Sequence, residues 1–205
     1  MDEARTAWRS PRAASTVALI GVTDPVRLPD PLAALVALPR GGTLIWRAYG
    51  AHLKAVPLRR LSAAARMKGC LLLVAGHPRC ARWLGVQGLH LPEYSVGKHF
   101  EHGHVYSLRD LPPGFVITAA CHSEAAIHAA ARAGVNAVLI SPVFPTASHP
   151  GAKTLGVVRF ARLARLARAL GMAPYALGGI ASASDMRRLS GSGAAGIAGV
   201  SLLLP

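Results

Sequence analysis

The sequence predicts a short (β/α)8 TIM barrel, an α/β fold, on two observations. Apolar, β-branched stretches recur along the 205 residues, and helix-like stretches separate them. Most of the apolar stretches lack polar alternation, which is typical of parallel strands that are covered on both faces. A doubly wound sheet is the alternative fold. The eight predicted strands are residues 16–22, 43–49, 70–75, 86–91, 115–121, 136–143, 173–179 and 196–204.

The helices between these strands have recognisable ends and faces. After the fifth strand, Ser123 is expected to cap a helix, with Glu124 in its first turn and Gly134 beyond its last. Residues 156–171 predict the most clearly amphipathic helix. We expect its apolar face to hold Val158, Leu163, Leu166 and Leu170, and its polar face to hold Arg159, Arg162, Arg165 and Arg168.

The domain boundaries follow from length and composition. Residues 17–205 are expected to form one barrel domain, because the fold usually begins near about 200 residues. Residues 1–16 carry acids and arginines without an apolar segment, so they predict a flexible leader and not a secretory signal. The sequence ends directly after the eighth strand, so the last outer helix is expected to be missing. We expect the leader, or a second subunit of a homodimer, to cover that strand.

The charge of the chain favours anionic ligands. Lys and Arg number 23 against 9 acids, which gives a formal net charge of +14. Such a surface attracts phosphates, nucleic acids or acidic lipids. The arginine stripe of residues 156–171 matches no known DNA-binding motif and fits a solvated outer helix, so no nucleic-acid partner is expected. Since no apolar run approaches about 18 residues, no membrane partner is expected either.

The cysteines indicate a reducing environment. Cys70, Cys80 and Cys121 are odd in number and form no C-x-x-C pair, which argues against a disulfide framework and a thiolate zinc site. A cytoplasmic protein is therefore expected. A loop with His99, Glu101, His102 and His104 contains metal-ligating residue types, but its spacing matches no established motif, and a solvated loop is the favoured interpretation.

Three loops are candidates for a phosphate site. In a barrel of this kind the active site lies at the carboxyl ends of the strands, and phosphate often binds at the loops after strands seven and eight. Gly178 and Gly179 end strand seven, before a helix start at Ser182, and Val200 and Ser201 have the corresponding place at strand eight. Their backbone N–H groups can bind an anion, although glycines also simply permit tight turns.

The loop after strand six adds polar side chains to the same end of the barrel. The segment "ISPVFPTASHPGAKTLG", residues 140–156, offers the hydroxyls of Thr146 and Ser148 to a phosphate. His149 or Lys153 can add positive charge. The three loops together predict a site for a small phosphorylated ligand.

These segments resemble the family of thiamine phosphate synthase and its relative, the thiazole tautomerase TenI. The resemblance begins near residue 19 and rests most specifically on "ACHSEAAIHAAARAGVNAVLISPVFPTASHPG", "YALGGI" and "GAAGIAGVSLL". It implies a barrel enzyme of thiamine biosynthesis, a transferase that joins a pyrimidine diphosphate to a thiazole phosphate. The thiazole phosphate is then expected at Thr146, Ser148, Gly179, Val200 and Ser201.

The pyrophosphate side departs from the family pattern. The resemblance implies that Arg47 is retained there, while the glutamine and lysine of the same motif are lost. Mg2+ would be the cofactor of a true synthase, but the aspartates that bind it fall at Ala75 or Gly76 and near Ser95 in this sequence. A hard cation prefers carboxylate oxygens. No metal-ligating residue is therefore predicted.

The candidate acid–base residues are His122 and His149. His149 occupies the position of the family's loop lysine, and His122 has a side chain that suits proton transfer near neutral pH. A strand-end histidine that only bonds neighbouring backbone is the alternative for His122. The sequence thus favours a synthase-like enzyme. A metal-independent tautomerase and a non-catalytic phospholigand-binding protein remain open.

Overall fold

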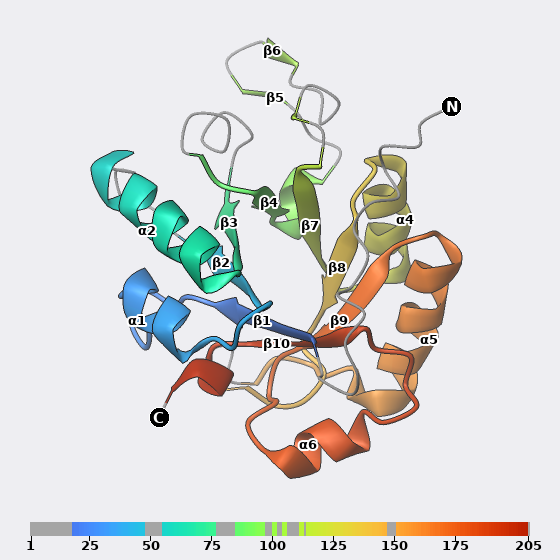
Figure 1. Cartoon of the computed structure of the whole chain (residues 1–205). Helices are drawn as coiled ribbons and strands as arrows, with labels where there is room; N and C mark the ends of the chain where they lie inside the picture. The colour runs from blue at the N-terminus through green and yellow to red at the C-terminus, as the bar shows by residue number, and fades with distance from the viewer. Residues whose placement is uncertain are drawn as a thin grey trace.

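Eight parallel strands close into a barrel, as the sequence predicts (Figure 1). The computed structural model describes residues 18–47, 55–76, 85–96, 100–101, 104–105, 111–112, 114–146 and 151–204. Around the barrel the strands follow the order β1-β10-β9-β8-β7-β4-β3-β2, with β2 pairing back onto β1. The TIM-barrel prediction is confirmed, and the predicted leader lies outside the described residues.

The strands are short and mostly buried. β4, β8 and β10 are buried at every position, as expected of parallel strands covered on both faces. The bounds are β1 Ala18–Val22, β2 Thr43–Trp46, β3 Leu71–Ala75, β4 Gly88–Leu91, β7 Val116–Cys121, β8 Ala137–Ile140, β9 Ala173–Leu177 and β10 Gly196–Gly199. Each lies within a predicted segment. Several predicted strands extend past the observed C-terminal ends, at places where a proline or a glycine begins the following loop.

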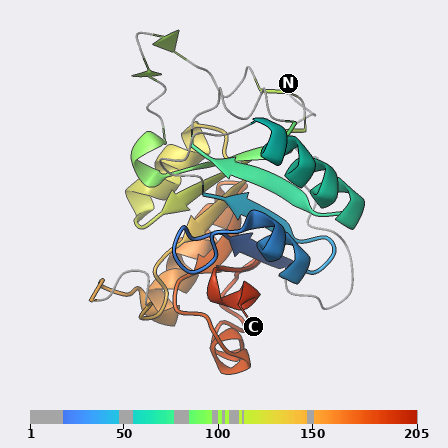
Figure 2. The same cartoon turned by 90° about the vertical axis from the view of Figure 1, so that its left-hand side faces the viewer.

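Helices surround the barrel (Figures 1 and 2). The α-helices are α1 Pro31–Ala37, α2 Ala55–Lys68, α4 Glu124–Arg132, α5 Gly156–Ala169 and α6 Ala183–Arg188. Short 3-10 turns, η2 Glu93–Ser95 and η4 Ser201–Leu203, follow β4 and β10, and β5 Phe100–Glu101 pairs with β6 His104–Val105 in a separate hairpin. Within the described ranges, no helix is both long and apolar enough to span a bilayer.

The predicted ends of α4 are confirmed. The Ser123 hydroxyl accepts a hydrogen bond from the Ala126 N–H at 3.2 Å, and Glu124 occupies the first turn. Gly134 has a φ of 75°, the left-handed conformation that closes a helix at little steric cost. Local sequence is sufficient to predict these helix ends, because a capping residue and the backbone group that it binds lie within one helical turn of each other.

The predicted apolar face of α5 is partly wrong. Val158 is 83% exposed and Leu170 is 39% exposed, whereas Phe160, Leu163, Ala164 and Ala167 are buried. At about 100° per residue, Val158 lies about 200° from Phe160 and therefore on the opposite side. Small alanines let the helix approach the strands closely. On the polar side, Arg162 forms an ion pair with Glu124 at 2.9 Å, as a solvated outer helix would.

A short turn covers part of the barrel wall near the last strand. β10 ends at Gly199, and the predicted strand over 196–204 is wrong beyond that point, since the chain turns into η4. Leu203 is 5% exposed and packs against β1, because a Cβ built on Gly21 would meet its side chain at 2.5 Å. The sequence predicts that the leader or a second subunit covers the last strand. η4 supplies at least part of this cover.

We predict that Leu203→Ala lowers the free energy of unfolding by about 2–4 kcal/mol, because it opens a gap over Gly21. Urea denaturation followed by circular dichroism measures the change. Leu204→Ala is the matched control, since Leu204 is 37% exposed, and it should change stability by less than about 0.5 kcal/mol. Equal losses in both variants would contradict the proposed packing.

Candidate functional site

A cavity of about 310 Å³ opens at the carboxyl ends of the strands. Its lining comes from the loops and strand ends after β1, β2, β7, β8, β9 and β10. This size is at the lower end of small-molecule sites. Among the described residues that line it, two are arginines and none is acidic. The lining residues are Val22, Arg27, Arg47, His122, Ser141, Pro142, Thr146, Ala152, Leu177, Gly178, Gly179, Ile180, Ala198, Gly199, Val200 and Ser201.

The structure brings most of the predicted site residues together. The predicted residues that line the cavity are Arg47, His122, Thr146, Gly178, Gly179, Val200 and Ser201. Ser148 and His149 lie outside the described residues. Lys153 is exposed and is not among the lining residues. The cavity therefore combines the proposed phosphate-binding loops with Arg47, which the family resemblance assigns to the pyrophosphate side.

The loops after β8 and β9 are held together by backbone hydrogen bonds. The N–H of Val143 donates to the carbonyl of Leu177 at 3.0 Å, and the N–H of Phe144 donates to the carbonyl of Gly178 at 3.0 Å. The N–H of Leu155 donates to Pro142 O at 2.9 Å and so closes the far end of the β8 loop. Thr146 is thus attached to a backbone that β9 fixes in place.

Glycine is required at positions 178 and 179. Both residues have positive φ, 96° and 70°, which disfavours any side chain. A Cβ on Gly178 would lie 3.0 Å from Pro142 Cα, and one on Gly179 would lie 2.6 Å from Phe144 Cβ. These glycines therefore permit both the turn and the close contact between the two loops, and their role in anion binding stays a prediction.

At the helix start after β9, a carboxylate of the chain binds two backbone N–H groups. α6 has only 6 residues, and a carboxylate of the chain already caps it. Asp185 Oδ2 accepts hydrogen bonds from the N–H groups of Ala181 and Ser182 at 3.2 and 3.0 Å. These two N–H groups are therefore occupied by a carboxylate of the chain, and anion binding at this helix start stays a prediction. Anion binding by the backbone N–H groups of Gly178 and Gly179 does not depend on this helix start.

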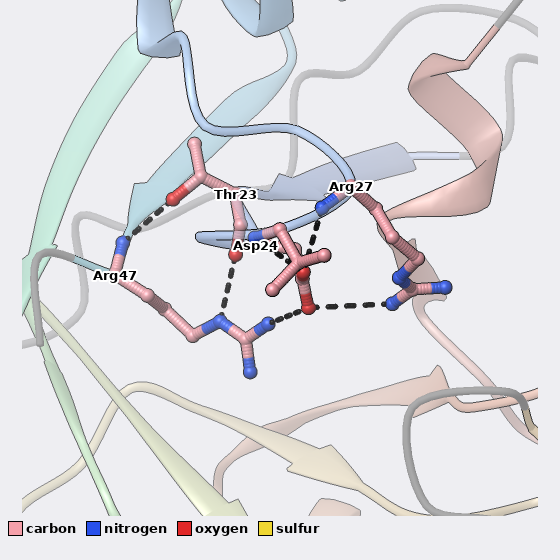
Figure 3. Close-up of polar contacts among 5 residues, drawn as sticks. Thr23, Asp24, Arg27 and Arg47 are labelled. Atoms are coloured by element: carbon pink, nitrogen blue, oxygen red, sulfur yellow. Dashed lines mark hydrogen bonds and ion pairs between the residues drawn. The ribbon is translucent and has the colours of Figure 1, made fainter.

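Two arginines and one aspartate form a charged cluster beside the cavity (Figure 3). Arg47 Nη2 and Arg27 Nη2 both donate to Asp24 Oδ2, at 3.1 and 3.4 Å. Arg47 is fixed further because its Nε donates to the Thr23 carbonyl at 2.7 Å and its backbone N–H donates to Thr23 Oγ1 at 2.8 Å. Two positive side chains therefore share one carboxylate oxygen.

Asp24 also organises the turn after β1. Its Oδ1 accepts hydrogen bonds from the backbone N–H groups of Val26 and Arg27 at 3.1 and 3.0 Å. The bond from the Arg27 N–H lowers the pKa of the Asp24 carboxyl, against the opposing effect of burial. The carboxylate therefore remains charged at neutral pH and holds both guanidiniums.

His122 lies at the rim with partners on both ring nitrogens. Its Nδ1 lies 2.7 Å from the Ser141 carbonyl oxygen, which can only accept, so Nδ1 carries a proton. Its Nε2 lies 3.4 Å from Glu93 Oε2, and the same oxygen accepts from the His122 backbone N–H at 3.0 Å. The ring is thus oriented by its neighbours while its side chain stays about half exposed, at 51%.

Two buried groups near the site stay neutral. Burial raises the pKa of the Cys121 thiol to about 12, and the Glu93 charge acts in the same direction, so this thiol is not a nucleophile at neutral pH. Burial lowers the pKa of His90 to about 4, and the Arg47 charge adds to the effect. His90 Nδ1 lies 2.8 Å from Thr118 Oγ1. Neither group suits acid–base chemistry at neutral pH.

The residues around the cavity do not fit a magnesium site. The described ranges contain no cluster of three or more His, Cys, Asp or Glu side chains that could hold a metal. Asp24 is engaged by two arginines, and Glu93 contacts His122. A Mg2+ ion needs oxygen ligands in octahedral geometry and is repelled by adjacent guanidiniums. His99 and His102 lie outside the described residues, so the nature of that loop stays a prediction.

The comparison with known families decides the membership of this chain. A sequence model described as thiamine monophosphate synthase (TMP-TENI) matches residues 42–203. The chain belongs to the thiamine monophosphate synthase family. The match spans β2 to η4 and so includes the loops after β8, β9 and β10. The resemblance in the sequence is therefore confirmed at the level of the family.

Individual relatives agree with this family. A protein of Aquifex aeolicus named "Putative thiamine-phosphate synthase 2" is 28% identical over 146 residues, which cover 71% of this chain and 73% of the relative. Thiamine phosphate pyrophosphorylase from Pyrococcus furiosus superposes with a TM-score of 0.64 at 19% identity, covering 89% of this chain and 84% of that one. A deoxyribose phosphate aldolase from Aeropyrum pernix superposes with a TM-score of 0.51 at 20% identity, covering 87% and 92%. The structural similarities support the fold alone.

Two residues of the site were missed in the sequence. Arg27 lies in the loop after β1, and the segment "TDPVR" carried a usable signal, because an aspartate often accepts bonds from the second and third following N–H groups. Glu93 lies two residues after the end of the fourth strand, near Ser95, where the family resemblance places a metal-binding aspartate. Its contact with His122 joins segments 29 positions apart, which no local pattern reveals.

We predict that His90 makes stability pH-dependent. Its folded pKa of about 4 lies below the ordinary value of 6.5, so the unfolded chain binds the proton first and stability falls as pH drops from about 6.5 to 4. The loss is on the order of 3 kcal/mol. His90→Gln should remove that part of the slope in urea denaturation from pH 7 to 4.5, whereas His128→Gln, an exposed control, should keep it. An unchanged slope in His90→Gln would contradict the assignment.

Proposed function

We propose that this chain catalyses the family's transfer reaction, joining a pyrimidine diphosphate to a thiazole phosphate. One observation carries the proposal: the loops after β8, β9 and β10 meet in one cavity together with two arginines. Both substrates are anions, and the described lining has positive side chains and no acidic one. Thr146, Gly178, Gly179, Val200 and Ser201 bind the thiazole phosphate in this proposal.

The reaction needs positioning and charge stabilisation more than a protein nucleophile. The thiazole ring nitrogen attacks the methylene carbon of the pyrimidine, a C–N bond forms, and the C–O bond to the diphosphate breaks. Thiamine phosphate and inorganic pyrophosphate are the products. The chain contributes by holding the two substrates in one cavity and by stabilising the leaving negative charge with fixed cations. No buried thiol is required, which agrees with the neutral Cys121.

We predict that Thr146→Val weakens binding of thiazole phosphate roughly 10- to 100-fold, because a hydrogen bond to a charged phosphate oxygen is lost without a change in shape. Isothermal titration calorimetry measures the affinity. Thr154→Val is the matched control, because Thr154 lies in the same segment between β8 and α5 but is not among the described lining residues. This substitution should leave the affinity within about twofold of wild type. Equal affinity in Thr146→Val and wild type would remove Thr146 from the site.

Catalytic turnover is tested with the same protein variants. Wild-type protein is mixed with both precursors, with and without Mg2+, and thiamine phosphate is measured by chromatography. Product formation that Thr146→Val reduces supports the proposal. An absence of product while a standard synthase works alongside contradicts it. Thiazole phosphate binding without turnover would instead indicate a phospholigand-binding protein.

A second candidate is a metal-independent isomerase or tautomerase that uses His122. The observation that favours it is the oriented ring, held between the Ser141 carbonyl and the Glu93 carboxylate at the edge of the cavity. A histidine that a carboxylate orients in this way can move a proton to or from a ligand. In this alternative the phosphate loops keep the same role and His122 is the catalytic residue.

We predict for this second candidate that His122→Ala abolishes exchange of ligand protons with solvent, a loss of at least about 100-fold, while thiazole phosphate still binds. Deuterium uptake by the bound ligand, followed by NMR, measures the exchange. His128→Ala, an exposed histidine on α4, is the matched control and should exchange normally. Exchange that persists in His122→Ala would exclude the isomerase role of this residue.

A further inference from the structure

We propose that Arg188 is a positioning residue for the proposed phosphate-binding loop after β8. Its guanidinium holds the ring of Phe144, and Phe144 fixes the backbone that carries Thr146. The inference rests on the proposed function, since it adds a residue from outside the barrel to the site that binds the thiazole phosphate. Arg188 is not among the described lining residues, so it acts through the loop and not by touching the ligand.

The guanidinium of Arg188 covers the buried ring of Phe144. The Cζ atom of Arg188 lies 4.2 Å from the centre of the ring, within the range of a cation–π contact. Phe144 is 5% exposed, whereas the Arg188 side chain is 57% exposed. The arginine thus lies between the ring and the solvent. This contact joins α6 to the loop after β8, although α5 and β9 separate the two segments in the chain.

Phe144 is the residue through which this contact reaches the cavity. Its backbone N–H donates to the Gly178 carbonyl at 3.0 Å, and a Cβ built on Gly179 would lie 2.6 Å from the Phe144 Cβ. Thr146, two residues further on, lines the cavity. A close-packed region transmits the movement of one group to its neighbours. A shift of the Phe144 ring would therefore disturb the contact with the glycine loop and displace the Thr146 hydroxyl.

Asp185 connects Arg188 to the loop after β9. Its Oδ1 lies 3.7 Å from Arg188 Nη1, and its Oδ2 accepts hydrogen bonds from the N–H groups of Ala181 and Ser182. These two residues directly follow residues 178–180, which line the cavity. One arginine therefore contacts the loop after β8 through an aromatic ring and the loop after β9 through a carboxylate. It holds the two loops together from outside the cavity.

The size of the effect follows from the exposure of the arginine. A cation–π contact at an exposed site changes an equilibrium by roughly two- to fivefold. The guanidinium also adds a positive charge to the molecule, and a charge attracts a phosphate without any contact to the ring. Two physical routes thus lead from Arg188 to phosphate affinity, and a double-mutant cycle with Phe144 separates them.

The test is this double-mutant cycle, read by isothermal titration calorimetry with thiazole phosphate. Arg188→Gln should weaken binding about two- to fivefold. In a Phe144→Leu background the same substitution should change the affinity by less than about 1.5-fold, because the ring through which the arginine acts is absent. Arg188→Lys should recover part of the loss, since an ammonium also contacts an aromatic face. Arg187→Gln, at an exposed neighbour on the same helix, is the matched control and should bind like wild type.

The transfer assay separates positioning from a loss of folded protein. Arg188→Gln should raise the KM for thiazole phosphate about two- to fivefold and leave the KM for the pyrimidine diphosphate within about 1.5-fold. A smaller fraction of folded protein would instead lower kcat and leave both KM values unchanged.

A measurement without ligand keeps this inference distinguishable from the proposed function. Hydrogen exchange in the native state, followed by NMR, reports on the bond from the Phe144 N–H to the Gly178 carbonyl. Arg188→Gln should speed exchange of the Phe144 amide about two- to fivefold and leave the amide of Leu139, buried in β8, unchanged. A general loss of stability would speed exchange at both amides.

Unchanged thiazole phosphate affinity in Arg188→Gln overturns the inference, and so does an equal loss of affinity in the wild-type and Phe144→Leu backgrounds. If Phe144→Leu is unfolded, the hydrogen exchange of Arg188→Gln decides the question. A wild-type protein that binds no thiazole phosphate overturns the proposed function. Exchange of the Phe144 amide then still confirms or overturns the role of Arg188 in holding the loop.

Discussion

The pairing of β1 with both β10 and β2 is the constraint on which the cavity depends. It closes the barrel, with Gly21 opposite Gly199 on one side and Val22 opposite Ile45 on the other. The carboxyl ends of these strands therefore lie at one level. Without the pairing of β1 to β10, the loops with Arg27 and Arg47 would lie at one edge of an open sheet and Ser201 at the other. Closure makes them walls of one site.

Close backbone packing defines the other wall. The loops after β8 and β9 exchange hydrogen bonds through Val143 and Phe144, and Gly178 and Gly179 leave no room for a Cβ between them. Arg188 of α6 adds a contact from outside, since its guanidinium lies 4.2 Å from the centre of the Phe144 ring. The loop that carries Thr146 is therefore fixed by its neighbours as well as by its own sequence. Such fixed groups stabilise a ligand without reorganising.

The electrostatics of the site differ from those of a metal centre. A single carboxylate, Asp24, holds two arginines, and a second, Glu93, holds the His122 ring. Each acid contacts a basic side chain of the protein, where a metal centre would have a metal ion. The neighbouring titratable groups Cys121 and His90 are kept neutral by burial and add no charge to this region. A chain with a formal charge of +14 also attracts anions over longer distances.

The sequence by itself determined the number and order of the eight barrel strands, the capped ends of α4 and the loops that carry Thr146, Gly178, Gly179, Val200 and Ser201, because these depend on short-range periodicity and on motifs. It could not determine contacts between distant segments. Arg27 meets Arg47 through Asp24 because β1 pairs with β2, and Glu93 meets His122 because β4 pairs with β7. The buried face of α5 likewise depended on which residues meet the strands, so Phe160 is inside and Val158 is not. Tertiary structure decided these points because long-range packing, and not local propensity, places each side chain.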